Sequence, residues 1–160
     1  MPDNNYSSRG NQTGFQPRGG GNRNGGDSQS KQSAEKKFSE LIFQKEWVLN
    51  GANPDLINYA EEAGKFMANN GLTNSKIRSI YGEIKRIQMG EFEKERSSFY
   101  LLRPKMAYAL GRDERNEGLK LFKLVFDLSS TYVTDQKSYQ NFCNFIEAIL
   151  AYHKSYGGKD

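Results

Sequence analysis

Apolar side chains recur every three or four residues along most of the chain after residue 33, which is the period of an α-helix. The clearest example runs from Leu72 to Gln88, where one helical face collects Ile77, Ile80, Tyr81, Ile84 and Ile87. Thr73 precedes this face, and we expect it to be the N-cap, with its hydroxyl accepting a hydrogen bond from an amide of the first turn. The pattern predicts a helix that packs one face on a core.

Similar patterns predict two helices before this stretch, each followed by residues that favour a helix end. The first runs from Ala34 to Leu49 and stops at Asn50-Gly51. Phe43 and Trp47 lie on the side opposite its main apolar face, and we expect them to pack against a second neighbour, the alternative being that they stack on a ligand base. The next helix begins with a cap and a proline at Asn53-Pro54 and stops at Asn70-Gly71.

Three more helical segments follow the central stretch. One runs from about Phe92 to Leu102, and Pro104 then forces a kink or a restart, because proline has no amide hydrogen and disfavours helix in the residue before it. Asp113 is expected to cap the next helix, and Thr134 or Asp135 to begin the last one. No alternating strand pattern of useful length is present, so the chain is predicted to be all-α, a compact bundle of about six helices.

Composition divides the chain into a tail, residues 1–33, and a helical domain, residues 34–156, after which the chain is expected to fray. The tail holds seven of the sixteen glycines among Asn, Ser and Gln and is expected to be disordered. Its arginines, Arg9, Arg18 and Arg23, resemble Arg-Gly segments that hold RNA loosely. The alternative is a passive flexible tail.

Net positive charge is concentrated in the middle of the chain. Residues 76–123 hold 12 basic and 7 acidic side chains, whereas residues 34–75 hold 4 basic and 6 acidic ones. This band suggests a localised anionic partner. The alternative is that the charges only solvate a helical surface.

Recognisable sets of catalytic or metal-binding residues are missing from the sequence. Cys143 and His153 are the only cysteine and histidine, and their spacing puts them on different faces of one helix, so neither a Cys–His pair nor a His-based zinc site is expected. We therefore expect no catalysis, no metal and no cofactor. A single cysteine, no spanning apolar run and no signal peptide favour a cytoplasmic protein without a membrane partner.

Two rows of cations accompany the predicted helices. Arg78 and Lys85 follow one edge of the apolar face at 72–88, while Arg86 points away from it. Lys105 and Arg112 form a second row around Tyr108. We expect these five cations to contact RNA phosphates, and Tyr81 and Tyr108 to lie in the core. The alternatives are internal salt bridges for Arg78 and Arg112, a solvated side chain for Lys105, and stacking platforms for Tyr81 and Tyr108.

The chain resembles a known family at these two stretches. Residues 72–87 read Leu-Thr-x-x-x-Ile-Arg-x-x-Tyr-x-Glu-Ile-x-Arg-Ile, and residues 104–112 read Pro-Lys-x-Ala-Tyr-Ala-x-Gly-Arg. In order, spacing and length they resemble the small α-helical subunit of type III-A CRISPR-Cas interference complexes, over roughly residues 38–155. The Arg-Gly tail lies outside the resemblance.

The resemblance implies a non-catalytic structural subunit of a ribonucleoprotein that acts in antiviral defence. It implies contact with the guide RNA–target RNA duplex, with the large polymerase-like subunit, with the backbone repeat subunits and with further copies of the chain itself. Base pairing reads the sequence in such machines, and the protein needs only to hold phosphates.

Two other hypotheses remain open at this point. The chain is an RNA-free helical adaptor whose basic band meets an acidic protein, or its RNA binding resides in residues 1–33 alone.

Overall fold

The computed structural model describes residues 32–160, and the segment expected to be disordered lies outside these residues except for its last two positions. Within this range the chain forms helices joined by loops and no strand, which confirms the all-α prediction. The helices are α1 (Ala34–Glu40), α2 (Glu46–Leu49), α3 (Pro54–Asn69), α4 (Asn74–Gln88), α5 (Phe92–Tyr100), α6 (Leu102–Gly111), α7 (Glu117–Ser130) and α8 (Gln136–Ser155).

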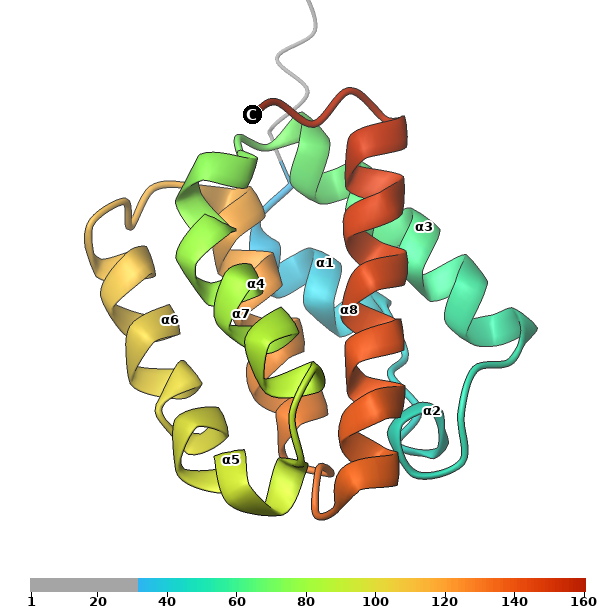
Figure 1. Cartoon of the computed structure of the whole chain (residues 1–160). Helices are drawn as coiled ribbons and strands as arrows, with labels where there is room; N and C mark the ends of the chain where they lie inside the picture. The colour runs from blue at the N-terminus through green and yellow to red at the C-terminus, as the bar shows by residue number, and fades with distance from the viewer. Residues whose placement is uncertain (1–31) are drawn as a thin grey trace, which may run out of the picture. The chain divides into compact units, whose positions relative to one another are not determined.

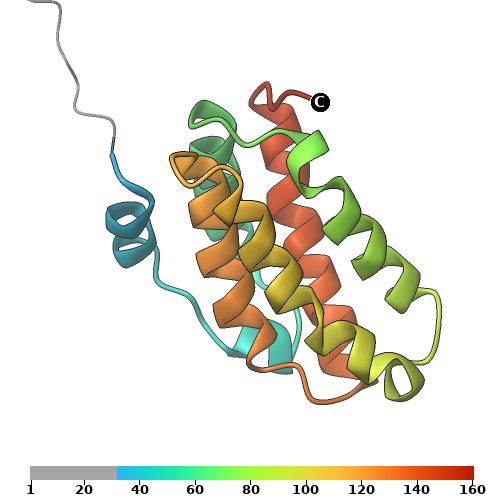
Figure 2. The ribbon, with the colours of Figure 1, turned by 90° about the vertical axis from the view of Figure 1, so that its left-hand side faces the viewer.

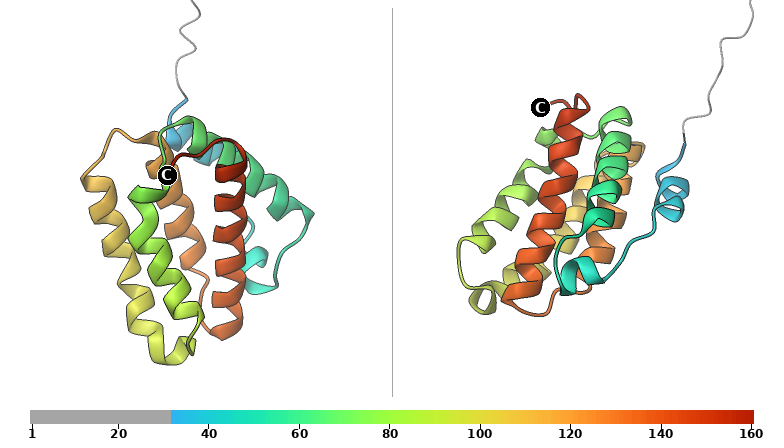
Figure 3. Two further views of the ribbon diagram at one scale, coloured as in Figure 1. Left: turned by 45° about the horizontal axis from the view of Figure 1, so that its top comes forward. Right: turned by 90° about the vertical axis from the view of Figure 1, so that its right-hand side faces the viewer.

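The longest helix, α8, packs against α3 and α2 on one side and against α4 on the other. Figure 1 shows α4 between α6 and α8, and Figures 2 and 3 place α1 on the side of the bundle away from α4. Close approach of α3 and α8 depends on Gly64, because a Cβ there would lie 2.6 Å from the carbonyl oxygen of Ile149. One face of α4 is therefore covered by the bundle, and its opposite face is left open.

The first predicted helix is divided in two, which corrects the expectation of one helix from Ala34 to Leu49. Leu41 ends α1 in an extended conformation, and the chain turns into α2 only at Glu46. This loop lets Phe43 stack on Tyr132 with ring centroids 5.9 Å apart. Trp47, 1% exposed, packs at 5.1 Å from Tyr59, so the expectation that these aromatic residues pack is confirmed.

Side-chain caps set several of the other helix boundaries. Asn53 caps α3 by accepting a hydrogen bond from the amide of Leu56, and Asp135 caps α8 in a capping box with Ser138, both as predicted. The expectation that Asp113 caps α7 is wrong, because Asn116 holds that position and accepts from the amide of Leu119.

Between α5 and α6 the chain restarts at Leu102, two residues before Pro104. Leu101 lies between the two helices, and Pro104 occupies the first turn of α6. Proline is tolerated there because the amides of the first turn have no partner within the helix.

The last residues, Gly157 to Asp160, form a C-terminal strap across the beginning of α4 instead of fraying. The amide of Asn74 donates to the carbonyl of Lys159 at 2.9 Å, and the Asn74 side chain donates to Asp160 at 2.9 Å. Thr73 is the N-cap of α4 as predicted, but its side chain makes no capping hydrogen bond. The strap supplies an acceptor to the first turn in place of the Thr73 hydroxyl.

Candidate nucleic-acid interface

Helix α4 presents its apolar face to the core and two edges to neighbouring helices. The four isoleucines of the predicted face, Ile77, Ile80, Ile84 and Ile87, are buried, and Tyr81 is half-buried. The core expectation for Tyr81 is thus met only in part. One edge of α4 faces α8 and the strap, and the other faces α6, so the predicted cations are divided between two environments.

On the edge that faces α8, polar contacts fix α4 to its neighbour. Lys85 forms an ion pair with Glu147 and donates to Gln88 at 3.1 Å, and the hydrogen bond with Glu147 raises the pKa of Lys85. Near this pair, the hydroxyl of Tyr139 donates to the carbonyl of Ile84 at 2.6 Å. Lys85 therefore already has an anionic partner within the chain.

Arg78 lies nearer the strap on the same edge. Hydrogen bonds from Asn74 and Lys154 hold the pKa of Asp160 below its usual range, and the positive charge of Arg78 adds to this effect. Arg78 itself is exposed and makes no hydrogen bond or ion pair with any residue from 32 to 160. Its guanidinium group is available to an outside anion.

Arg86, at the α5 end of α4, is held by two carboxylates. It bonds Glu83 at 2.6 Å and Glu95, on α5, at 3.0 Å. The hydrogen bonds to Glu83 and Glu95 raise the pKa of Arg86, and its own hydrogen bonds lower the pKa of each carboxyl. Arg86 therefore joins α4 to α5, although it is predicted to contact RNA.

A groove of about 800 Å³ lies between α4 and α6. On α4 it is lined by Ser75, Lys76 and Ser79, and on α6 and the turn after it by Pro104, Lys105, Tyr108, Ala109, Arg112 and Asp113. Lys76 and Asp113 close one part of it with an ion pair of 2.6 Å. The structure thus brings the second predicted row, Lys105 and Arg112, to the wall of a groove.

Neither Lys105 nor Arg112 forms an ion pair with another residue of the described range. Both are exposed, and Arg112 lies over the ring of Tyr108, 5.8 Å from its centroid. Tyr108 is itself 68% exposed, so the expectation that it lies in the core is wrong. The core side of α6 is occupied instead by Leu102 and Met106.

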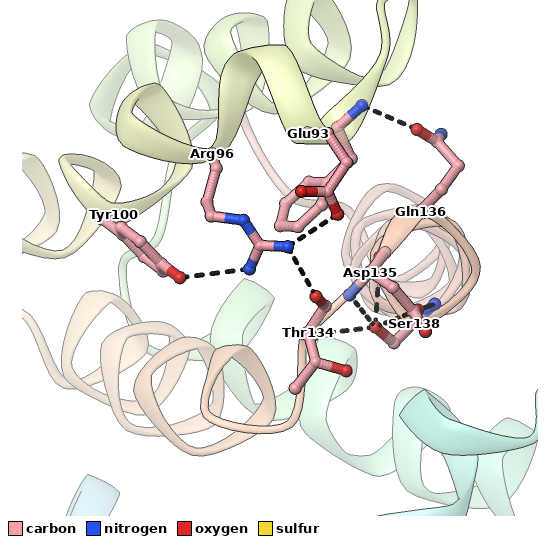
Figure 4. Close-up of polar contacts among 8 residues, drawn as sticks. Glu93, Arg96, Tyr100, Thr134, Asp135, Gln136 and Ser138 are labelled. Carbon is pink, nitrogen blue, oxygen red and sulfur yellow. Dashed lines mark hydrogen bonds and ion pairs between the residues drawn. The ribbon is translucent and has the colours of Figure 1, made fainter.

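Most other cations of the basic band have partners within the chain. Arg103 fixes α6 to the end of α7 by donating to the carbonyl of Asp127 at 2.6 Å. Figure 4 shows the guanidinium of Arg96 between Glu93, Tyr100 and the carbonyl of Thr134. These contacts tie α5 to the loop before α8, so the charge of Arg96 supports the fold.

The chain matches the family model Csm2 Type III-A over residues 51–159. It belongs to this Csm2 family. It is a structural subunit of a type III-A CRISPR effector complex, which confirms the resemblance noted in the sequence. No curated protein and no solved structure matches the chain.

The part matched to the Csm2 family extends from just before α3 into the strap. It therefore contains the groove, both edges of α4 and all five predicted RNA-contacting residues. Helices α1 and α2 precede it.

The single cysteine and the single histidine of this Csm2-family chain are both buried. Burial raises the pKa of the Cys143 thiol to about 12, which leaves it protonated and unreactive near neutral pH. His153 is fully buried, and its Nε2 lies 2.8 Å from the carbonyl oxygen of Leu72. The described residues contain no group of three His, Cys, Asp or Glu side chains arranged to hold a metal ion.

Helices of the described range are too short or too polar to cross a membrane. Among the described residues, the exposed functional groups that stand out are the cations Lys105 and Arg112 beside the groove between α4 and α6. Such a surface can hold phosphate oxygens.

Proposed function

We propose that this chain is a non-catalytic subunit that binds the guide RNA–target RNA duplex through its phosphates. Lys105 and Arg112 at the groove are the main contacts, and Arg78 on the other edge of α4 is an additional one. The observation that carries the proposal is the difference in pairing: these three cations are exposed and lack ion-pair partners among residues 32–160, while Lys85 and Arg86 are paired.

The chemistry of these side chains suits a phosphate backbone. Arginine offers a planar fork that bonds two phosphate oxygens at once, and lysine acts as a compact point charge. Neither contact distinguishes one base from another, and in a guided complex the base pairing carries the sequence information. The chain would therefore bind duplexes of different sequence with similar affinity.

Lys85 and Arg86, which their place on the helix predicts to contact RNA, belong to the same proposal in a lesser role. Each would have to leave a carboxylate within the chain before it could bind a phosphate. We therefore rank them below Arg78, Lys105 and Arg112. In the assembled complex the large polymerase-like subunit, the backbone subunits and further copies of the chain would adjoin this surface.

The test compares the unpaired cations with a paired one. The double variant Lys105→Ala/Arg112→Ala should bind an RNA duplex more weakly than the unchanged chain. The slope of log K against log salt should become shallower by about 0.7–0.9 for each phosphate that the variant no longer neutralises. Fluorescence anisotropy between about 50 and 200 mM salt measures both quantities.

Lys94→Ala is the matched control, because it removes one exposed cation of the same basic band that is paired, with Glu91, and is not among the proposed contacts. It should leave the slope nearly unchanged. A chain lacking residues 1–33 should bind as the full chain does, and loss of binding in that variant would transfer the function to the tail. Absence of RNA binding even at low salt would leave the protein adaptor as the function.

A further inference from the structure

Tyr108 occupies an unusual place for a large aromatic side chain. It is 68% exposed on α6 and lines the groove between α4 and α6. Its hydroxyl makes no hydrogen bond with any residue from 32 to 160. Because the guanidinium of Arg112 lies over one face of the ring, the other face and the hydroxyl are free to meet a ligand.

The residues around Tyr108 extend this surface. Lys105 and Tyr108 lie on α6, and Arg112 is its C-cap with a helical backbone conformation, so at i, i+3 and i+7 the three lie on one side. The guanidinium of Arg112 lies over the ring of Tyr108, 5.8 Å from its centroid, so it covers part of one face and leaves the other face for a ligand. At 1.5 Å per residue, the two cations are about 10 Å apart along the helix, one on each side of the ring.

The facing wall of the groove has the complementary character. Ser75 and Ser79 lie one turn apart on α4 and bring small side chains with hydroxyl groups into the groove, and Lys76 between them is held by its ion pair with Asp113. A flat group stacked on Tyr108 would meet these hydroxyls at its edge. The groove volume of about 800 Å³ lies within the range usual for small-molecule sites.

Building on the RNA-binding function above, we propose that this groove takes one unpaired nucleobase, stacked on Tyr108 with its edge toward Ser75 and Ser79. Lys105 and Arg112 bind the phosphates on either side of that nucleotide. Aromatic side chains stack on any base, so the site has no strong preference of sequence. A paired base is inaccessible to it, because both of its faces are covered within the helix.

The site therefore distinguishes RNA by shape. A duplex with one unpaired nucleotide offers both phosphates and a free base, whereas a fully paired duplex offers phosphates alone. Phosphate binding by Lys105 and Arg112 is common to both, so the ring of Tyr108 accounts for the difference between them.

The experiment uses the full chain and two RNA duplexes that differ in one unpaired 2-aminopurine nucleotide. The unchanged chain should bind the duplex with the unpaired nucleotide about tenfold more tightly. Tyr108→Ala should remove this preference and leave the affinity for the paired duplex within about twofold. Tyr108→Phe should keep the preference, and 2-aminopurine fluorescence should be quenched on binding to the unchanged chain and to the Phe variant only.

Tyr100→Ala is the control for loss of an exposed tyrosine, since Tyr100 is 56% exposed and lies outside this groove. It should leave the preference intact. Equal binding of the two duplexes by the unchanged chain overturns the stacking site and leaves the phosphate-binding function standing. Failure to bind either duplex overturns both proposals.

Discussion

Cations of the same types lie along the two edges of α4: Lys85 on α4 itself toward α8, and Lys105 and Arg112 across the groove, on α6 and at its end. On the edge toward α8, Lys85 is paired with Glu147, and Asn74 is bound to Lys159 and Asp160 of the strap. On the edge toward α6, a groove separates α4 from the side chains of the neighbouring helix. One edge is closed by contacts within the chain except at the exposed Arg78, and the other is open apart from the Lys76–Asp113 ion pair.

This difference shows that the position of a cation on a helix does not by itself indicate whether the cation is free to bind an outside anion. A cation with a carboxylate already beside it gains less from a phosphate, because the existing pair must first be broken. Lys105 and Arg112 have no such pair within the described residues. The comparison makes the open edge the main functional surface, and it makes the closed edge, apart from the exposed Arg78, part of the support.

The largest expected effect concerns the thiol of Cys143 on α8, the helix that faces the closed edge of α4. Cys143 is buried, and its pKa is raised from 9.0 to about 12, which lowers its thiolate fraction at pH 8 about a thousandfold. A thiol reagent should modify the folded chain at least that much more slowly than the chain unfolded in urea. Absorbance of a released chromophore gives both rates.

The same pKa has a consequence for stability. Because folding raises the pKa of Cys143, the stabilisation from its neutral thiol is complete below pH 9 and is lost as the pH rises toward 12.

Rapid modification of the folded chain at pH 8 would show that α8 and α4 separate readily, and the two edges would then not differ as described.

The next effect concerns the strap. A Cβ at Gly158 would lie 2.2 Å from the buried ring of His153, so Gly158→Ala should displace the strap and cost about 1–3 kcal/mol of unfolding free energy. Urea denaturation measures this loss. Lys159→Ala is the control, because the exposed side chain is removed while the carbonyl that binds Asn74 remains. A Gly158→Ala chain as stable as the control would mean that the strap contributes little to the closed edge.

Helices α3, α4 and α8 could be predicted from the sequence because each has a regular apolar face and a clear beginning. The same apolar periodicity wrongly predicted a continuous helix through residues 41–45, where aromatic contacts with distant helices favour a loop. It failed again at the strap, whose contacts join residues more than eighty positions apart. Local patterns carry no information about such partners.

Prediction of the candidate site met the same limit. The sequence identified the cations and their rows, but the partner of Lys85 lies on another helix, at Glu147, and only the fold brings them together. The exposure of Tyr108 did have a signal in the sequence. At 100° per residue it lies about 200° from the buried Met106, on the opposite side of α6. The proposed RNA contacts themselves stay predictions.

The smallest expected effect concerns the outward face of α4 between its two edges. Gly82 lies in the middle of this helix, and a Cβ there would meet nothing within 4 Å. Because glycine loses more backbone freedom on folding than alanine, Gly82→Ala should stabilise the chain by about 0.5–1 kcal/mol. Gly64→Ala is the matched contrast, since its Cβ would collide with the backbone of α8 and should destabilise the chain.

Urea denaturation measures the unfolding free energy of the two variants, which should rise for Gly82 on an open helix face and fall for Gly64 on a covered one. RNA affinity adds a second measurement for Gly82→Ala, which should stay within about twofold of the unchanged chain because the methyl group lies outside the groove. A stabilised variant with much weaker RNA binding would mean that the RNA backbone approaches α4 closely at Gly82. The open surface would then include the outward face of α4 as well as its α6 edge.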